Sequence, residues 1–178
     1  MDPAHISRFL SILTVFGQLT VVLLALLIFL PTQKRSFIFN FISKNSYIFS
    51  FIVALMATSG SLYYSEIAGF TPCILCWYQR ILMYPQVALL AVALWKNEKI
   101  ITDYILTLSL LGTPLSIYHY LLQRGLVPNI SCSAVGFSIS CAEKFVMNFG
   151  YITIPLMAAT AFALIALFML LFKRSKNF

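Results

Sequence analysis

The sequence predicts an all-α integral membrane protein, and three observations lead to this fold class. Of the 178 residues, 61% are apolar and only 10% are charged, whereas a soluble domain is about half apolar and about a quarter charged. Apolar runs of roughly the 20 residues needed to cross a bilayer recur along the chain. The cations stand in short clusters between these runs, as topology signals do, so the net charge of +7 does not indicate nucleic-acid binding.

The first apolar run extends from Phe9 to Leu30 and is long enough to span a membrane. A cleaved signal peptide is the alternative, but the run is long for one, and no small-residue cleavage site follows it. We therefore interpret it as a retained anchor. The basic connector after it contains a short apolar segment, Phe37 to Ile42, which we expect at the membrane surface. Residues 1–45 are thus predicted to form an N-terminal anchor and a cytoplasmic connector.

Four further spans are predicted within residues 46–178. Their predicted limits are Tyr47–Tyr64, Ile74–Trp95, Ile101–Leu122 and Tyr151–Phe172. Pro85 lies inside the Ile74–Trp95 span, the third of the five, where we expect a kink. The longest polar segment, residues 123–148, connects the last two spans.

The distribution of Lys and Arg predicts the orientation of five spans. Because successive connectors alternate between the two sides, eight cations fall on one side and four on the other: Lys34, Arg35, Lys44, Lys96, Lys99, Lys173, Arg174 and Lys176 against Arg8, Arg80, Arg124 and Lys144. The more basic side is expected to be cytoplasmic, together with the C-terminus. All four cysteines then lie on the outer side, which favours thiol–disulfide chemistry over metal binding.

The four cysteines are the main candidates for chemistry, and they allow three disulfide connectivities. Cys73 and Cys76 form a C-x-x-C pair at the start of the third span, where a helix N-terminus favours a thiolate. Cys132 and Cys141 lie in the long polar segment, which can meet a soluble protein. Two outward-facing dithiols in one membrane protein indicate transfer of electron pairs between them.

Arg80 follows Cys76 by four residues and is expected on the same helix face, one turn away. A cation at that depth is a functional-site hypothesis, although its side chain could simply reach the membrane interface. It could donate hydrogen bonds to a lipid-soluble two-electron acceptor that has carbonyl oxygens. The residues alone therefore indicate an electron relay from a soluble dithiol to a membrane quinone. His119, at the outer end of the fourth span, could assist proton transfer to the reduced quinone, or could be an ordinary interfacial histidine.

The residues around the C-x-x-C pair resemble a known family signature. The stretch from Pro72 to Arg80, PCILCWYQR, with MYP at residues 83–85, closely resembles the signature of the DsbB family of disulfide bond formation proteins. The WYQR form is similar to its BdbC branch, as is the stretch from Cys141 to Pro155. The resemblance covers about Tyr47 to Arg174.

This resemblance implies a four-helix transmembrane bundle of DsbB type, preceded here by an additional N-terminal transmembrane helix. It implies a bound quinone, ubiquinone or menaquinone, and a DsbA-like or BdbD-like thioredoxin-fold oxidase as partner. The protein would re-oxidise that partner outside the bacterial cytoplasmic membrane and pass the electrons to the quinone pool, supporting disulfide formation in exported proteins.

The resemblance also implies a role for each site residue. The redox-active disulfides would be Cys73–Cys76 and Cys132–Cys141, and no metal is expected. Cys132 would be attacked by the partner, Cys141 would be its loop mate, Cys73 would receive the electrons and Cys76 would contact the quinone ring. Arg80 matches the family's quinone-associated arginine, whereas His119 is a candidate quinone residue from its position alone.

Two departures from the family pattern and three alternatives remain. The first span has no counterpart in the family's core, and Gln79 stands where many members carry an acid. A vitamin K epoxide reductase-like quinone reductase is one alternative, but there the loop pair precedes the C-x-x-C pair. The others are a non-catalytic membrane protein with structural disulfides and a four-thiolate metal site.

Overall fold

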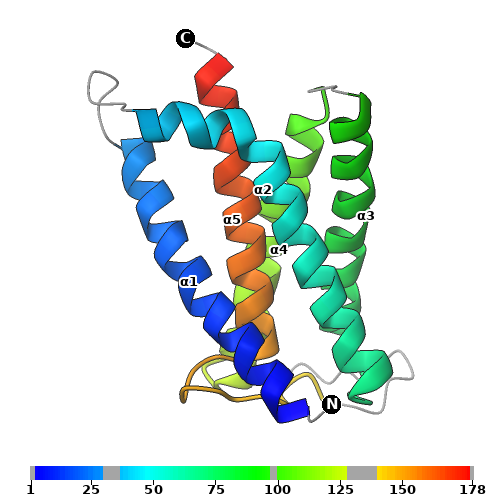
Figure 1. Ribbon diagram of the computed structural model, residues 1–178. Helices are drawn as coiled ribbons and strands as arrows, with labels where there is room; N and C mark the ends of the chain where they lie inside the picture. The colour runs from blue at the N-terminus through cyan, green and yellow to red at the C-terminus, as the bar shows by residue number, and fades with distance from the viewer. Residues whose placement is uncertain (1–2, 30–36, 97–99, 128–139, 177–178) are drawn as a thin grey trace.

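The computed structural model describes residues 3–29, 37–96, 100–127 and 140–176, and most of these residues are helical (Figure 1). In chain order the elements are α1 (Pro3–Phe29), α2 (Phe37–Leu62), a π-helical turn η2 (Tyr63–Ile67), α3 (Ile74–Lys96), α4 (Thr102–Gln123) and α5 (Ile154–Lys176). The described ranges contain no β-strand beyond one isolated bridge, between Asn148 and Ile152. The predicted all-α fold is confirmed.

Helix α5 lies at the centre of the bundle, in contact with α1, α2 and α4. It has no charged residue before Lys173, and its alanines allow neighbouring helices to approach closely. Phe162, Ile165 and Met169 on this helix are completely buried. Gly112 of α4 makes room for the Phe162 ring, since a Cβ atom at Gly112 would lie only 2.4 Å from it. The core therefore depends on a glycine facing an aromatic ring.

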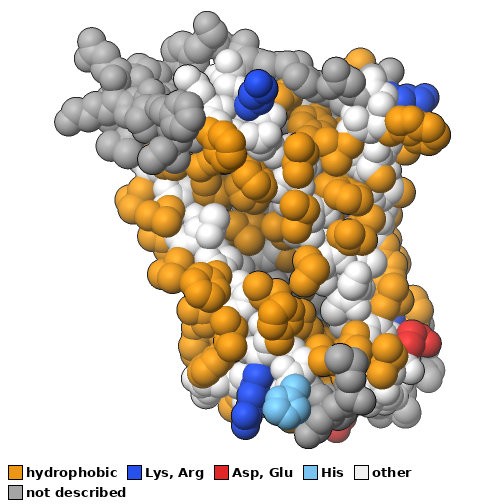
Figure 2. Space-filling view, in the orientation of Figure 1, with side chains coloured by type: hydrophobic (Ala, Val, Ile, Leu, Met, Phe, Trp, Pro, Cys, Tyr) orange, Lys and Arg blue, Asp and Glu red, His pale blue; other side chains and the backbone are white. Residues whose placement is uncertain are grey.

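Within the described residues, four helical segments are long and apolar enough to cross a membrane, namely α1, α2 with η2, α4 and α5. Helix α3 has 23 residues and runs alongside α2 and α4 (Figure 1), but Gln79, Arg80 and Gln86 make it more polar. Figure 2 shows an extensive apolar surface between two ends at which the charged side chains gather. This arrangement is that of a multi-pass membrane protein, as the sequence predicts.

The helices begin and end somewhat differently from the predicted spans. Helix α1 already begins at Pro3, and α2 begins at Phe37, so the short apolar segment after the first span is the start of α2. Figure 1 shows these first turns of α2 lying across one end of the bundle before the helix descends. Phe39 in this segment is only 4% exposed and belongs to the main core cluster. Helix α2 thus runs through the predicted domain boundary between residues 45 and 46.

The bundle has two chemically different ends (Figure 1). The N-terminus, the start of α3, the end of α4 and residues 140–153 lie at one end, which we call the cysteine end. The C-terminus lies at the opposite end, where Lys173 forms an ion pair of 2.7 Å with Asp103. The fold therefore gathers the described cysteines at the end remote from the C-terminus.

Candidate functional site

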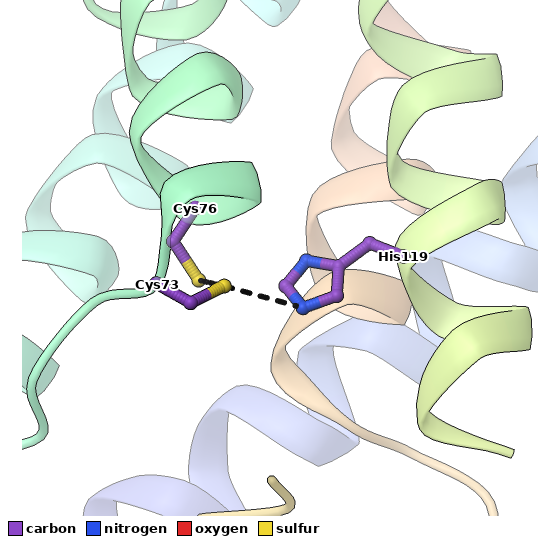
Figure 3. A group of neighbouring side chains, drawn as sticks. All are labelled: Cys73, Cys76 and His119. Atoms are coloured by element: carbon purple, nitrogen blue, oxygen red, sulfur yellow. Dashed lines mark hydrogen bonds between the residues drawn. The ribbon is translucent and has the colours of Figure 1, made fainter. Parts of the chain in front are cut away.

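The C-x-x-C pair lies where the chain enters α3. The backbone N–H of Trp77 donates to the carbonyl of Cys73 at 3.1 Å, which closes the first helical turn and brings the two cysteines together. Their sulfurs are 3.6 Å apart, and the Cys73 thiol donates to Cys76 (Figure 3). Because a disulfide needs an S–S distance of about 2.05 Å, small side-chain rotations suffice to join them. The pair is placed to form and break a disulfide.

Cys141 is distant from the C-x-x-C pair in the sequence but lies beside it in the structure. It is 2% exposed and packs in a small cluster with Cys73 and Leu122, and its side chain interacts with the Cys73 thiol. A turn closed from Glu143 N–H to the Ser140 carbonyl at 3.1 Å holds the backbone around it. Three cysteines therefore meet at one point, with Cys73 between the other two.

Cys132 lies outside the described residues. Its predicted attack by a partner protein and its predicted pairing with Cys141 remain predictions.

His119, near the end of α4, faces the sulfurs. It is 1% exposed, and its Nε2 atom lies 3.7 Å from Cys73 Sγ and 3.1 Å from the Cys141 carbonyl oxygen (Figure 3). Its Nδ1 atom lies 2.9 Å from the amide nitrogen of Gln79. A carbonyl only accepts hydrogen bonds, so these partners assign the proton of the neutral ring to Nε2, with Nδ1 accepting from Gln79. The Nε2–H group is thus directed at the carbonyl oxygen of Cys141 and at the sulfur of Cys73.

The contact between Gln79 and His119 is absent from the sequence-based picture. There Gln79 appears only as a departure from the family pattern, whereas in the structure it is 7% exposed and orients the histidine. The signal available in the sequence was an amide residue, Gln79, directly before the proposed quinone ligand Arg80. The predicted role of His119 in proton transfer to quinone is not tested by this geometry and remains a prediction.

The hydrogen bond that Cys73 donates to Cys76, together with burial, raises the pKa of the Cys73 thiol to about 12. Cys73 lies just before α3, and at neutral pH it holds its proton and shares it with Cys76. In the reduced pair, Cys76 is therefore the sulfur that accepts the hydrogen bond.

A cavity of about 330 Å³ lies between α1, α2, α3 and α5, next to the C-x-x-C pair. Its walls are mainly apolar and include a few polar side chains: Thr14, Ser61, Tyr64, Thr71, Gln79, Arg80, Tyr84 and Thr160. A smaller space beside it is bordered by Cys73, His119 and Cys141. Cys76 borders both spaces, so it is the sulfur that faces the large cavity.

Arg80 borders the large cavity and is held in place from α2. Its Nε donates to Ser61 Oγ at 3.1 Å, its Nη2 donates to the Ser61 carbonyl at 3.2 Å, and its guanidinium lies 5.2 Å from the Trp77 ring centre. These hydrogen bonds use two of the five N–H groups of an arginine. An apolar cavity with a fixed cation at one end suits a flat apolar molecule that carries hydrogen-bond acceptors.

The same cysteines and histidine also satisfy the simplest requirement of a metal site. One ligand atom each from Cys73, Cys76 and His119 lie within 4.8 Å of one another. The hydrogen bonding of the histidine argues against ligation, since its Nε2 faces the Cys141 carbonyl and must carry a proton there. A zinc ligand needs the free lone pair of that nitrogen.

Comparisons with known proteins point to one family. The family model "Disulfide bond formation protein DsbB" matches residues 43–172. "Disulfide bond formation protein C" of Bacillus subtilis is 43% identical over 142 residues, covering 75% of this chain and 99% of the relative. "Probable disulfide formation protein C" of Halalkalibacterium halodurans is 41% identical over 134 residues, covering 75% and 96%. No solved structure matches. Helix α1 lies before the region that the family model matches.

Proposed function

Because the chain belongs to the DsbB family of disulfide bond formation proteins, we propose that it re-oxidises a DsbA-like thioredoxin-fold oxidase and passes the electrons to membrane quinone. The observation that carries the proposal is the meeting of Cys73 with both Cys76 and Cys141, next to a cavity bordered by Arg80. This arrangement supplies an entrance, a transfer point and an exit for an electron pair.

The entrance is the loop pair. A thiolate of the reduced partner attacks Cys132 of the Cys132–Cys141 disulfide, which forms a mixed disulfide and releases Cys141 as a thiolate. The second thiol of the partner then attacks the partner sulfur that is bonded to Cys132, which releases Cys132 as a thiolate. The partner leaves oxidised, and the loop pair holds the two electrons as a dithiol.

The transfer point is Cys73. The Cys141 thiolate attacks Cys73 of the Cys73–Cys76 disulfide, so that a Cys73–Cys141 bond forms and Cys76 leaves as a thiolate. Cys132 then attacks Cys141, which restores the loop disulfide and releases Cys73. The burial of Cys141 against Cys73 supports this step, because the attacking and accepting sulfurs are already neighbours.

His119 serves this exchange in the proposal. Its Nε2–H points at the Cys141 carbonyl and lies within 3.7 Å of Cys73 Sγ, so it can donate to that sulfur when Cys73 departs as a thiolate. Gln79 keeps the proton on Nε2 through its bond to Nδ1. The pair thus assists release of Cys73 from the Cys73–Cys141 bond.

The exit is the large cavity, and its residues fit a quinone. Its volume of about 330 Å³ and its apolar walls suit an aromatic ring, and Arg80 offers N–H groups to a carbonyl oxygen. A bound ubiquinone or menaquinone would supply a two-electron, two-proton acceptor. Cys76 borders the cavity as the sulfur nearest to that acceptor, and Arg80 would stabilise negative charge on an oxygen.

The energetics favour such an acceptor. A DsbA-type oxidase has a potential of about −120 mV, and a tenfold bias in a two-electron equilibrium needs only about 30 mV. Re-oxidising so strong an oxidant with a thiol pair alone leaves little driving force. Removal of the electrons by a quinone pool supplies it.

The proposed orientation places the cysteine end outside the cytoplasmic membrane and the C-terminus inside. The distribution of Lys and Arg along the sequence supports this orientation, because eight of the twelve fall on the side of the C-terminus. The outer compartment is the one in which a thioredoxin-fold oxidase meets exported proteins.

The test is quinone reduction by purified protein given a reduced thioredoxin-fold oxidase and a soluble quinone. We expect Cys73→Ser and Cys132→Ser to abolish turnover, because each removes one sulfur of the relay. Ser140→Ala is the matched control, since it alters the same turn without removing a sulfur. Unchanged turnover in either cysteine variant would refute the proposal.

The rival metal site gives a different result in a simple assay. A zinc site would leave about one zinc per purified chain and thiols protected until the metal is chelated. The relay requires zinc-free protein whose thiols become alkylatable after treatment with a reductant.

A further inference from the structure

Building on the proposed function, we propose that α1 forms one wall of the quinone cavity and thereby determines which acceptors fit. Leu10, Leu13 and Gly17 would contact the bound acceptor or the side chains that confine it. This assigns a binding role to the helix that precedes the matched family region, residues 43–172.

One face of α1 borders the cavity. The lining residues Leu10, Leu13, Thr14 and Gly17 follow the spacing i, i+3, i+4, i+7 of a single helix face. The other side of α1 is exposed apolar surface suited to lipid, at Phe9, Ile12, Phe16, Leu19, Val22, Leu23 and Leu26. Leu13, which lines the cavity and is 39% exposed, lies at the border between the two faces. The helix therefore has an inner face and a lipid face.

Polar contacts fix both ends of α1 to the bundle. Toward the cysteine end, Asn148 Nδ2 donates to Ser11 Oγ at 2.8 Å, and nearer the middle of α1 the Tyr151 hydroxyl donates to Gln18 Oε1 at 3.1 Å. At the opposite end, Arg174 Nη1 donates to the Ile28 carbonyl at 2.7 Å. An apolar helix that only anchored the chain would need no such specific partners. These contacts hold the inner face in one orientation.

Close packing in the middle of α1 sets its distance from α5. A Cβ atom at Gly17 would lie 3.0 Å from Thr160 and 3.3 Å from Leu164, so only glycine allows this approach without a shift of the neighbours. Thr160 and Leu164 also border the cavity. Gly17 thus allows α1 to pack directly against α5 beside the cavity.

On the other side, α1 contacts α2 toward the cysteine end. A Cβ atom at Gly60 would lie 3.4 Å from Leu10, and the Tyr64 hydroxyl donates to Ser7 Oγ at 3.4 Å. Gly60 and Tyr64 also border the cavity. Without α1, the side of the cavity formed by Leu10, Leu13 and Thr14 would face lipid. A wall of protein at that position restricts the size of ring that can lie beside Arg80 and Cys76.

The experiment uses the full chain in lipid nanodiscs and a photoreactive azidoquinone with a short tail. After irradiation, peptide mass spectrometry identifies the labelled segments. We expect label within residues 9–17 of α1 as well as on α3, and competition by unmodified quinone. Label confined to helices other than α1 would overturn the proposal. This readout does not depend on turnover. It therefore distinguishes an error in the proposed role of α1 from an error in the proposed redox function.

A matched pair of variants measures the effect of the wall on affinity. Leu13→Trp adds bulk on the inner face, and Leu19→Trp adds the same bulk on the lipid face, where Leu19 is 58% exposed. We expect Leu13→Trp to raise the Kd of a labelled quinone by about tenfold or more, and Leu19→Trp to leave it unchanged. Leu13→Ala, which should fold readily, is expected to change the relative affinity for quinones with bulkier rings. Equal affinities and equal preferences in all these variants would contradict the proposal.

Discussion

Replacing Arg80 with histidine removes the cation that borders the large cavity while leaving every cysteine in place. In the structure, Arg80 is held by two hydrogen bonds to Ser61 and lies next to the Trp77 ring, so its remaining N–H groups are fixed near Cys76. We expect Arg80→His to weaken quinone binding without slowing exchange between the loop pair and the C-x-x-C pair.

The size of the effect follows from the lost interaction. A hydrogen bond from a charged donor contributes about 1.5–3 kcal/mol. Since about 1.4 kcal/mol changes an equilibrium tenfold, the Kd for quinone should rise by about 10-fold to 150-fold. Ser61→Ala should have a smaller effect, because it removes the side-chain acceptor but leaves the carbonyl that holds Nη2.

The assay is quinone dependence of turnover together with equilibrium binding of a labelled quinone. Arg124→His is the matched control, because Arg124 also lies at the cysteine end but is exposed and donates to the Gly150 carbonyl. Exchange is followed separately by alkylation of the loop thiols after a single addition of reduced oxidase. An Arg80→His variant with unaltered quinone affinity would show that the cation has no role in binding the acceptor.

Three further predictions concern the sulfurs and the core. Because the pKa of the Cys73 thiol is raised to about 12, its alkylation by iodoacetamide in reduced, folded protein should keep rising with pH beyond 9; a plateau near 9 would contradict the raised pKa. For the same reason its contribution to stability is present below its ordinary pKa and is lost as the pH rises through about 12. His119→Ala should slow Cys73–Cys141 exchange about 100-fold and leave the quinone Kd unchanged. A raised quinone Kd with unchanged exchange would instead assign His119 to quinone binding. Gly112→Ala should cost about 1–3 kcal/mol of stability by driving a methyl group into Phe162, while lipid-facing Leu111→Ala should cost much less; equal melting temperatures would refute this packing.

Much of the fold was predictable because most of the helices correspond to one apolar run each. The third and fourth spans were placed within one residue of α3 and α4, since charged or polar residues flank both helices. The start of α2 was predicted about ten residues too late, at Tyr47 instead of Phe37. The segment from Phe37 to Ile42 is too short to span a membrane alone, and it continues into the next apolar run as one helix because Phe39 is buried in the core. Such tertiary burial leaves no local signal.

The candidate site was predictable where its residues are close in sequence. Cys73, Cys76 and Arg80 share about two helical turns, so their proximity follows from helix geometry alone. The contacts of Arg80 with Ser61 and of Gln79 with His119 join separate helices. They depend on how α2, α3 and α4 pack, which the periodicity of any one helix does not specify. The same holds for α1, whose inner face is distinguished only by what it contacts.

The account rests on the transfer of electrons between Cys141 and Cys73, and one measurement tests that step most directly. In a Cys76→Ser, Cys132→Ser variant, Cys73 and Cys141 are the only cysteines left. Mild oxidation followed by peptide mass spectrometry should reveal an intramolecular Cys73–Cys141 disulfide in most molecules, formed faster than the Cys76–Cys141 disulfide of the Cys73→Ser, Cys132→Ser variant. If both thiols stay alkylatable, or if disulfides form only between molecules, the proposed relay through Cys73 is contradicted.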